Sequence, residues 1–153
     1  MTKIVGMIGG MSWESSSHYY KLINREVHSR LGRQHNARSL LFTLDFDELD
    51  VAAGEGNWQL IGDRVSDAAQ RLERAGADFI MITSVTGHAV FEDVRASVGV
   101  PLLHIADAVK GKIGKGARIG LLGTKFTLEM PHATEIPQME ASEAPRLLPV
   151  GRI

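Results

Sequence analysis

Polar side chains that could take part in chemistry follow an apolar run in the middle of the chain. Residues 77–83 read ADFIMIT, and Ser84, Val85 and Thr86 then offer two hydroxyls and three backbone amides ahead of His88. Such groups at the start of a helix can hold a carboxylate or another small anion. A histidine beside them can act as an acid, a base or a carboxylate partner. The alternatives are ordinary helix capping by Ser84 or Thr86 and a structural role for His88.

A glycine-rich turn near the N-terminus offers a second set of backbone amides. Residues 6–11 read GMIGGM, between a predicted strand and a predicted helix. The glycines lack the G-x-G-x-x-G spacing of a dinucleotide site, and the Walker spacing is absent as well. The amides of Met11, Ser12 and Trp13 could still hold a carboxylate at a helix N-terminus. Otherwise the glycines only permit a tight turn.

His104 lies at the carboxyl end of a predicted strand and has the same two interpretations as His88, a role in the chemistry or a structural role. His18 and His35 are expected in solvent. Residues 45–48 read DFDE, an acidic group of the kind that usually forms a solvated turn. The six histidines are scattered along the chain, and we expect no metal site.

The elements that position these residues are predicted from the pattern of apolar side chains. Strands are expected over residues 3–8, 39–44, 77–83 and 101–105, and helices over residues 12–31, 58–76, 88–98 and 106–113. Strands that alternate with helices along the chain are typical of a parallel sheet. The sequence therefore predicts an α/β fold: a three-layer domain with a parallel sheet of about four strands flanked by helices.

The C-terminal part of the chain has a different pattern. Residues 114–116 read GKG and are expected to be a linker, followed by a fifth strand over residues 118–122. Residues 129–153 contain four of the five prolines and show no sustained period, so irregular chain is expected there. We therefore expect an α/β domain over residues 1–113, a linker and a strand over residues 114–128, and then the tail.

The composition excludes several classes of protein. Apolar residues make up 44% and charged residues 23%, as in ordinary globular domains. The net charge of −1 gives no basic surface for nucleic acid, and no apolar run is long enough to span a membrane. The 153 residues contain no cysteine, which excludes thiol catalysis within this chain and favours a reducing cytoplasm.

Four blocks of the sequence resemble the cofactor-independent aspartate/glutamate racemase family. They are IGGMSWESSSHYYKLIN at residues 8–24, GADFIMITSVTGHAVF at 76–91, VPLLHIADA at 100–108 and IGLLGTKFT at 119–127. Their order and spacing match the family over residues 3 to about 130. The resemblance implies the N-terminal domain of a two-domain fold, with residues 118–122 as the first strand of the second domain.

The resemblance also implies an activity and a site. Members of the family interconvert L- and D-aspartate or glutamate by moving the α-proton between two cysteines, one in each domain, without PLP or metal. Thr83 stands at the position of the first catalytic cysteine, and Val85 replaces an asparagine of the family pattern. The residues that match the substrate-binding positions are Met11, Ser12, Ser84, Val85, Thr86 and His88.

Three functions stay open at this point. The first is a racemase for aspartate or glutamate, to which this chain contributes half of the site. The second is a module that binds an amino acid or a dicarboxylate without turnover, because a threonine hydroxyl has no accessible anion near neutral pH. The third is a truncated product without activity. The expected partner is the small amino acid, with no nucleic acid and no membrane, and a homodimer is plausible because family members often pair.

Overall fold

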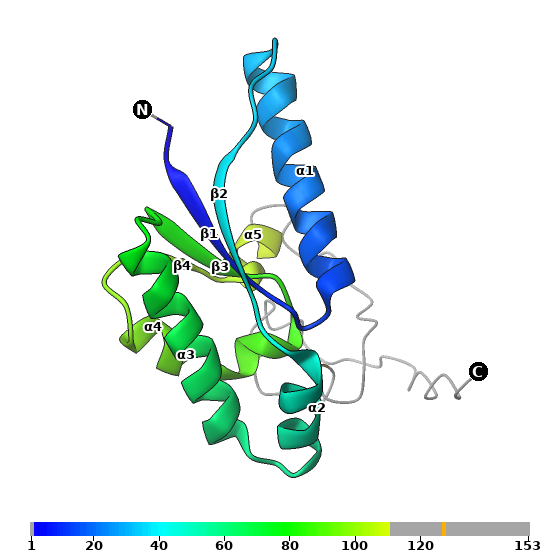
Figure 1. The fold of residues 1–153 in the computed structure, drawn as a ribbon, viewed down its shortest axis with the longest axis vertical. Helices are drawn as coiled ribbons and strands as arrows, with labels where there is room; N and C mark the ends of the chain where they lie inside the picture. Colours follow the sequence, from blue (N-terminus) through cyan, green and yellow to red (C-terminus); the bar gives the residue numbers. More distant parts are fainter. Residues whose placement is uncertain (1, 111–126, 128–153) are drawn as a thin grey trace, which may run out of the picture. The chain divides into compact units, whose positions relative to one another are not determined.

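The computed structural model describes residues 2–110 and Thr127 (Figure 1). The chain divides into two compact units, Met1–His104 and Ile105–Ile153. The strands of the first unit are β1 (Ile4–Gly9), β2 (Arg38–Thr43), β3 (Phe79–Ile82) and β4 (Leu102–Leu103). Its helices are α1 (Trp13–Leu31), α2 (Phe46–Gly54), α3 (Trp58–Arg74), the 3-10 helix η1 (Thr86–Val90) and α4 (Phe91–Ala96). In the second unit the structure describes α5 (Ile105–Lys110).

The four strands form one parallel sheet in the order β2-β1-β3-β4. In its register Met7 of β1 lies opposite Leu41 of β2 on one side and Met81 of β3 on the other. The chain leaves β1 toward β2 and later returns to the opposite side of β1 as β3. The topological switch point of the sheet therefore lies between β1 and β3, where α/β proteins bind their ligands.

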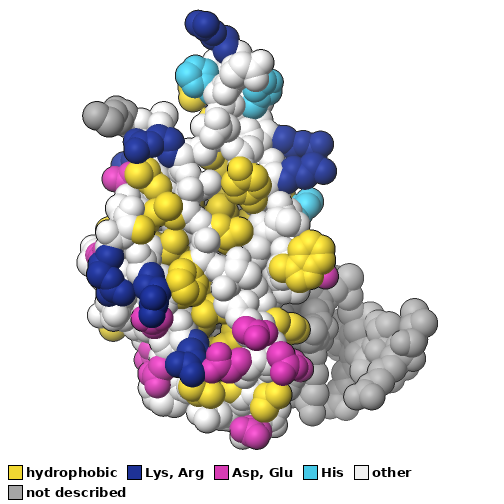
Figure 2. Space-filling view, viewed as in Figure 1, with side chains coloured by type: hydrophobic (Ala, Val, Ile, Leu, Met, Phe, Trp, Pro, Cys, Tyr) yellow, Lys and Arg dark blue, Asp and Glu magenta, His cyan; other side chains and the backbone are white. Residues whose placement is uncertain are grey.

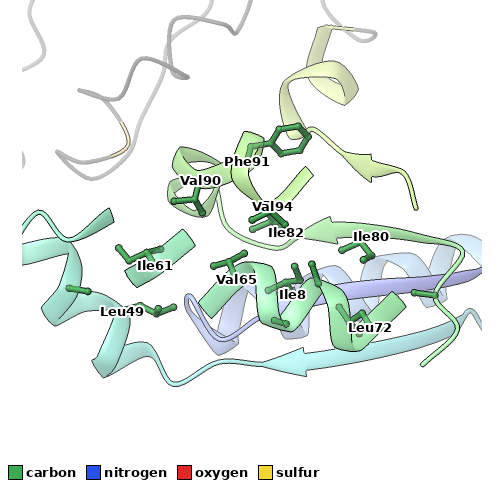
Figure 3. Close-up of a cluster of buried hydrophobic side chains, with 14 residues drawn as sticks. Ile8, Leu49, Ile61, Val65, Leu72, Ile80, Ile82, Val90, Phe91 and Val94 are labelled. Atoms are coloured by element: carbon green, nitrogen blue, oxygen red, sulfur yellow. The ribbon is translucent and has the colours of Figure 1, made fainter. Parts of the chain in front are cut away.

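The main core lies between the sheet and α3 (Figure 3). Ile8 of β1 and Ile80 and Ile82 of β3 point toward α3, which presents Val65 and Leu72 to them (Figure 3). Side chains alternate between the two faces of a strand, so the same strands can also bury residues on the other face. There Met7 is fully buried, and α1 crosses that side of the sheet (Figure 1).

The α/β class and the parallel sheet of four strands confirm the prediction from the sequence, but two elements differ from it. The acidic segment at residues 45–48 is not a solvated turn but the start of α2. The side chain of Asp45 accepts the backbone N–H of Asp47 at 3.2 Å, and Leu49 of the helix is buried. An N-cap and a negatively charged first turn favour a helix, and this explains the element that the prediction missed.

The helix predicted over residues 88–98 is also different. The structure has a five-residue 3-10 helix, η1, followed by α4, which ends at Ala96. The last part of the predicted helix 106–113 lies outside the described residues. So do the linker, the strand over residues 118–122 and the tail over residues 129–153. Within residues 2–110, no helix is long and apolar enough to cross a membrane.

Candidate functional site

Two of the predicted sites come together at the carboxyl ends of β1 and β3. The loop that follows β1 contains Met11 and Ser12, and the loop that follows β3 begins at Thr83. The two loops touch: a Cβ placed on Gly87 would lie 3.2 Å from the sulfur of Met11. The sequence could not show this contact, because adjacent strands of the sheet bring together segments about 70 residues apart.

Thr83 is held at the centre of this site by hydrogen bonds. Its side chain is only 1% exposed. Both its backbone N–H and its hydroxyl donate to the carbonyl of Ile8, each at 3.0 Å. The hydroxyl oxygen also lies 2.9 Å from Oγ of Ser16. The Thr83 hydroxyl is therefore occupied by the protein itself and does not face solvent.

The first turns of α1 connect to the end of β3 through two serines that were not among the predicted site residues. Ser15 Oγ donates to the carbonyl of Thr83 at 2.7 Å. Ser16 is buried, and its Oγ accepts the N–H of Gly10 at 3.2 Å and lies 3.1 Å from the carbonyl of Ser12. The run of three serines at residues 15–17 was the available signal, since helix interiors rarely gain from serine.

The turn between β1 and α1 requires glycine. Gly10 has a φ of +95°, and a Cβ there would collide with the backbone of Leu44. The tight turn therefore requires glycine at residue 10, whereas Gly6 and Gly9 lie within β1. Ser12, the N-cap residue of α1, makes no side-chain hydrogen bond to the helix. The first amides of a helix have no partner within the helix, so the positive end of this 19-residue helix opens at the switch point.

The loop after β3 offers fewer groups for binding an anion than the N-terminus of α1 does. Ser84 is not the N-cap residue predicted as one alternative, but its Oγ accepts the N–H of Gly87 in the first turn of η1 at 3.2 Å. Thr86 is the first residue of η1, whose N-cap is Val85. A helix of five residues has a much weaker dipole than α1. Val85 is 46% exposed and gives this side of the site an apolar surface.

His88 is buried, with 2% of its surface exposed, and it packs within an aromatic group. Its Nδ1 lies 2.7 Å from the carbonyl of Ser84. We assign the Nδ1–H as the donor, since a carbonyl oxygen can only accept. The ring stacks on Phe91 at 5.7 Å and meets the edge of His104 at 4.8 Å. The structure thus brings His104, the other histidine candidate from the sequence, next to His88.

Acidic side chains lie further along the same edge of the sheet. Asp45, Asp47 and Glu48 are exposed at the start of α2, where Figure 2 shows a concentration of acidic side chains. In the part of the chain that the structure describes, no group of three or more histidines and carboxylates could hold a metal ion. The site therefore consists of backbone amides, hydroxyls and two histidines around an α/β switch point.

The fold is an α/β fold with candidate residues at the topological switch point of its sheet, and comparison with known proteins shows the family. Residues 8–145 match the model of the Asp/Glu/hydantoin racemase family, and the chain belongs to that family.

Three relatives illustrate the match. A protein from Yersinia pestis, whose crystal structure is assigned as an Asp/Glu racemase, is 44% identical to this chain, with a TM-score of 0.71. The match covers 72% of this chain and 48% of the Yersinia pestis chain. An aspartate racemase homologue from Pyrococcus horikoshii OT3 is 33% identical, with a TM-score of 0.67, over 73% and 48%. The broad specificity amino-acid racemase RacX of Bacillus subtilis (strain 168) is 33% identical over 66 residues, which are 42% of this chain and 29% of RacX. The chain spans about half the length of the two solved relatives.

Proposed function

We propose that this chain supplies one wall of a PLP-independent amino-acid racemase site for aspartate or glutamate. The amides at the start of α1, from Met11 to Trp13, bind the carboxylate of the amino acid. The observation that carries this proposal is the N-terminus of α1, whose N-cap residue Ser12 makes no side-chain hydrogen bond to the helix and which lies at the switch point beside Thr83. Ser84, Val85 and Thr86 form the opposite side, with His88 behind them.

In this proposal Thr83 helps to hold the site in place and does not transfer a proton. Racemisation moves the α-proton of the amino acid, so it needs a base on each face of Cα. The hydroxyl of Thr83 already donates its proton to Ile8, and a threonine needs a strong neighbouring base before it can accept another. The described wall thus binds and orients the amino acid, and the bases for turnover come from outside it.

The burial and hydrogen bonds of the Thr83 hydroxyl also support a second function, binding without turnover. Because the Thr83 hydroxyl is buried and occupied, the wall can hold an amino acid or dicarboxylate without turnover. Aspartate and glutamate are the ligands that the family suggests. RacX is a racemase of broad specificity, and Val85 is an apolar contact surface, so an uncharged amino acid such as methionine belongs in the same set of tests.

We also propose that the protein forms a homodimer through β2. Of the described strands, β2 pairs with β1 alone, and its other edge can pair with a second copy. Tyr20 and Leu31 of α1 and Leu41 of β2 are each about half exposed. Figure 2 shows hydrophobic side chains along β2 and the adjoining side of α1. A two-fold contact would cover this surface and the strand edge together.

A pair of substitutions at one position tests the carboxylate site. Proline is favoured as the first residue of a helix, and the extended backbone of Ser12 suits a following proline. Trp13→Pro therefore removes one amide donor and keeps α1, whereas Trp13→Ala removes the same side chain and keeps the amide. We expect NMR titrations to show that Trp13→Ala binds L-aspartate or L-glutamate as the wild type does and that Trp13→Pro binds about tenfold more weakly. Equal affinity of the two variants, or no binding by the wild type, would contradict the proposal.

A further inference from the structure

Ser16 is a buried polar side chain whose contacts connect the two loops of the site. Only 2% of its surface is exposed. Its Oγ lies 3.2 Å from the N–H of Gly10 in the loop after β1 and 2.9 Å from Oγ1 of Thr83 at the end of β3. It also lies 3.1 Å from the carbonyl of Ser12, at the start of its own helix. One hydroxyl therefore joins β1, α1 and β3.

The direction of these hydrogen bonds follows from the protons available. The N–H of Gly10 donates to Ser16, and the hydroxyl of Thr83 donates to the carbonyl of Ile8. The Ser16 proton is left between the carbonyl of Ser12 and Oγ1 of Thr83. When this proton points to Thr83, a continuous chain of hydrogen bonds runs from Gly10 through Ser16 and Thr83 to Ile8. Hydrogen bonds in such a chain strengthen one another.

The neighbouring serines show that this role is particular to Ser16. Ser17 is exposed, and its hydroxyl donates to the carbonyl of Glu14 within α1. Ser15 reaches Thr83 but not the glycine turn. The strand also presses closely on Ser16, because a Cβ on Gly9 would lie 2.5 Å from its Oγ. The distance between α1 and the end of β1 therefore depends on this one side chain.

We infer that Ser16 is a positioning residue of the amino-acid site. It fixes Gly10 and Thr83 relative to each other, and so sets the distance between the amides after β1 and the loop after β3. It does not touch the ligand. The inference rests on the proposed function for the ligand, but the coupling of the two loops can be measured without any ligand.

The test compares Ser16→Ala with two controls. Ser17→Ala removes a neighbouring hydroxyl that is exposed, and Ile61→Val weakens the α3 core without removing a polar group. Affinity for L-aspartate and L-glutamate is measured by NMR titration at a temperature where circular dichroism shows every variant folded. We expect Ser16→Ala to bind about tenfold more weakly than the wild type and both controls to stay within about twofold of it. Equal affinity of Ser16→Ala and Ile61→Val would overturn the inference.

A second measurement separates this inference from the proposed function. Amide hydrogen exchange of Gly10 is followed without ligand and compared with that of Met7, a buried residue of β1. We expect Ser16→Ala to accelerate exchange at Gly10 about tenfold more than at Met7, and Ile61→Val to change the two alike. If the wild type binds no amino acid but this difference appears, the proposed function fails and the coupling by Ser16 stands. Unchanged exchange at Gly10 would overturn the inference in either case.

Should Ser16→Ala not fold, Ser16→Cys replaces it in both measurements. A thiol keeps the volume of the side chain but forms weaker hydrogen bonds. The same directions are expected, with smaller differences. Wild-type behaviour of Ser16→Cys in both affinity and exchange would overturn the inference.

Discussion

In the proposed site, Thr83 takes the place of a reactive cysteine and is held by hydrogen bonds. Its position in the family pattern can be recognised from the sequence. Its burial and hydrogen bonds cannot, because Ile8 and Ser16 lie 75 and 67 residues away along the chain. The structure thus adds that this residue links two strands and a helix.

Replacing the Thr83 hydroxyl tests that link. Thr83→Val keeps the shape of the side chain and removes the hydrogen bonds to Ile8 and Ser16. We expect the free energy of unfolding to fall by about 1–2 kcal/mol, measured by urea denaturation. Thr43→Val, at an exposed position of β2, is the matched control and should change stability by less than about 0.5 kcal/mol. A Thr83→Val variant as stable as the wild type would show that the buried hydroxyl contributes nothing.

Introducing a thiol at residue 83 tests whether a single base is enough for racemisation. Thr83→Cys places a thiol among the 153 residues, where no other cysteine is present to act on the opposite face of Cα. We expect no interconversion of L- and D-aspartate or glutamate by this variant in chiral chromatography. Substantial interconversion would contradict the requirement for two bases, one on each face.

At the scale of elements, the turn between β1 and α1 should be the most sensitive part of the site. In Gly10→Ala the new Cβ would sit on a residue with a positive φ and would also collide with the backbone of Leu44. Gly56→Ala has a positive φ but no atom within 4 Å of the new Cβ, so it is the matched control. We expect a loss of about 1–2 kcal/mol for Gly56→Ala and of more than about 3 kcal/mol for Gly10→Ala in thermal unfolding. Similar losses would mean that contact with Leu44 is unimportant.

The packing of α1 gives a prediction for alkaline pH. Burial raises the pKa of Tyr19 from its ordinary value of 10.0, because the charged phenolate is poorly solvated there. Above that value the unfolded chain loses the proton while the folded chain keeps it, so stability falls as the pH rises through the raised pKa. Tyr19→Phe should reduce this decline in urea denaturation between about pH 9 and pH 11, and Tyr20→Phe is the control. If the stability of Tyr19→Phe fell with pH as steeply as that of the wild type, the attribution of this decline to Tyr19 would be contradicted.

The elements also show what a sequence reveals and what it conceals. The buried strands were predictable because their apolar runs are continuous, as expected for parallel strands. The helix α2 was missed although Asp45 and the buried Leu49 carry its signal, because nine residues give too few turns for a clear period. The residues of η1 make contacts that the sequence does not show: Gly87 donates to Ser84 Oγ and packs closely against Met11, which is a tertiary contact.

At the scale of the whole molecule, the proposed homodimer is the simplest property to test. Tyr20→Lys with Leu41→Lys places charge on the proposed contact surface beside β2. Leu22→Lys is the control, because Leu22 is equally exposed but lies about 200° around α1 from Tyr20. In sedimentation velocity we expect a dimer for the wild type and Leu22→Lys, and a monomer for the double variant. A wild-type monomer, or a double variant that still pairs, would contradict the proposed contact.

The central claim is that this chain forms a wall of an amino-acid racemase site in which residue 83 is held in place and does not act as a base. Solvent deuterium incorporation at Cα of L- and D-aspartate and glutamate, followed by NMR with the purified chain, tests it most directly. We expect line broadening of the amino acids, which reports binding, and no loss of the Cα proton signal from either enantiomer. Exchange of even one enantiomer would contradict the claim, since a base would then act within these 153 residues, and His88 would be the first residue to replace.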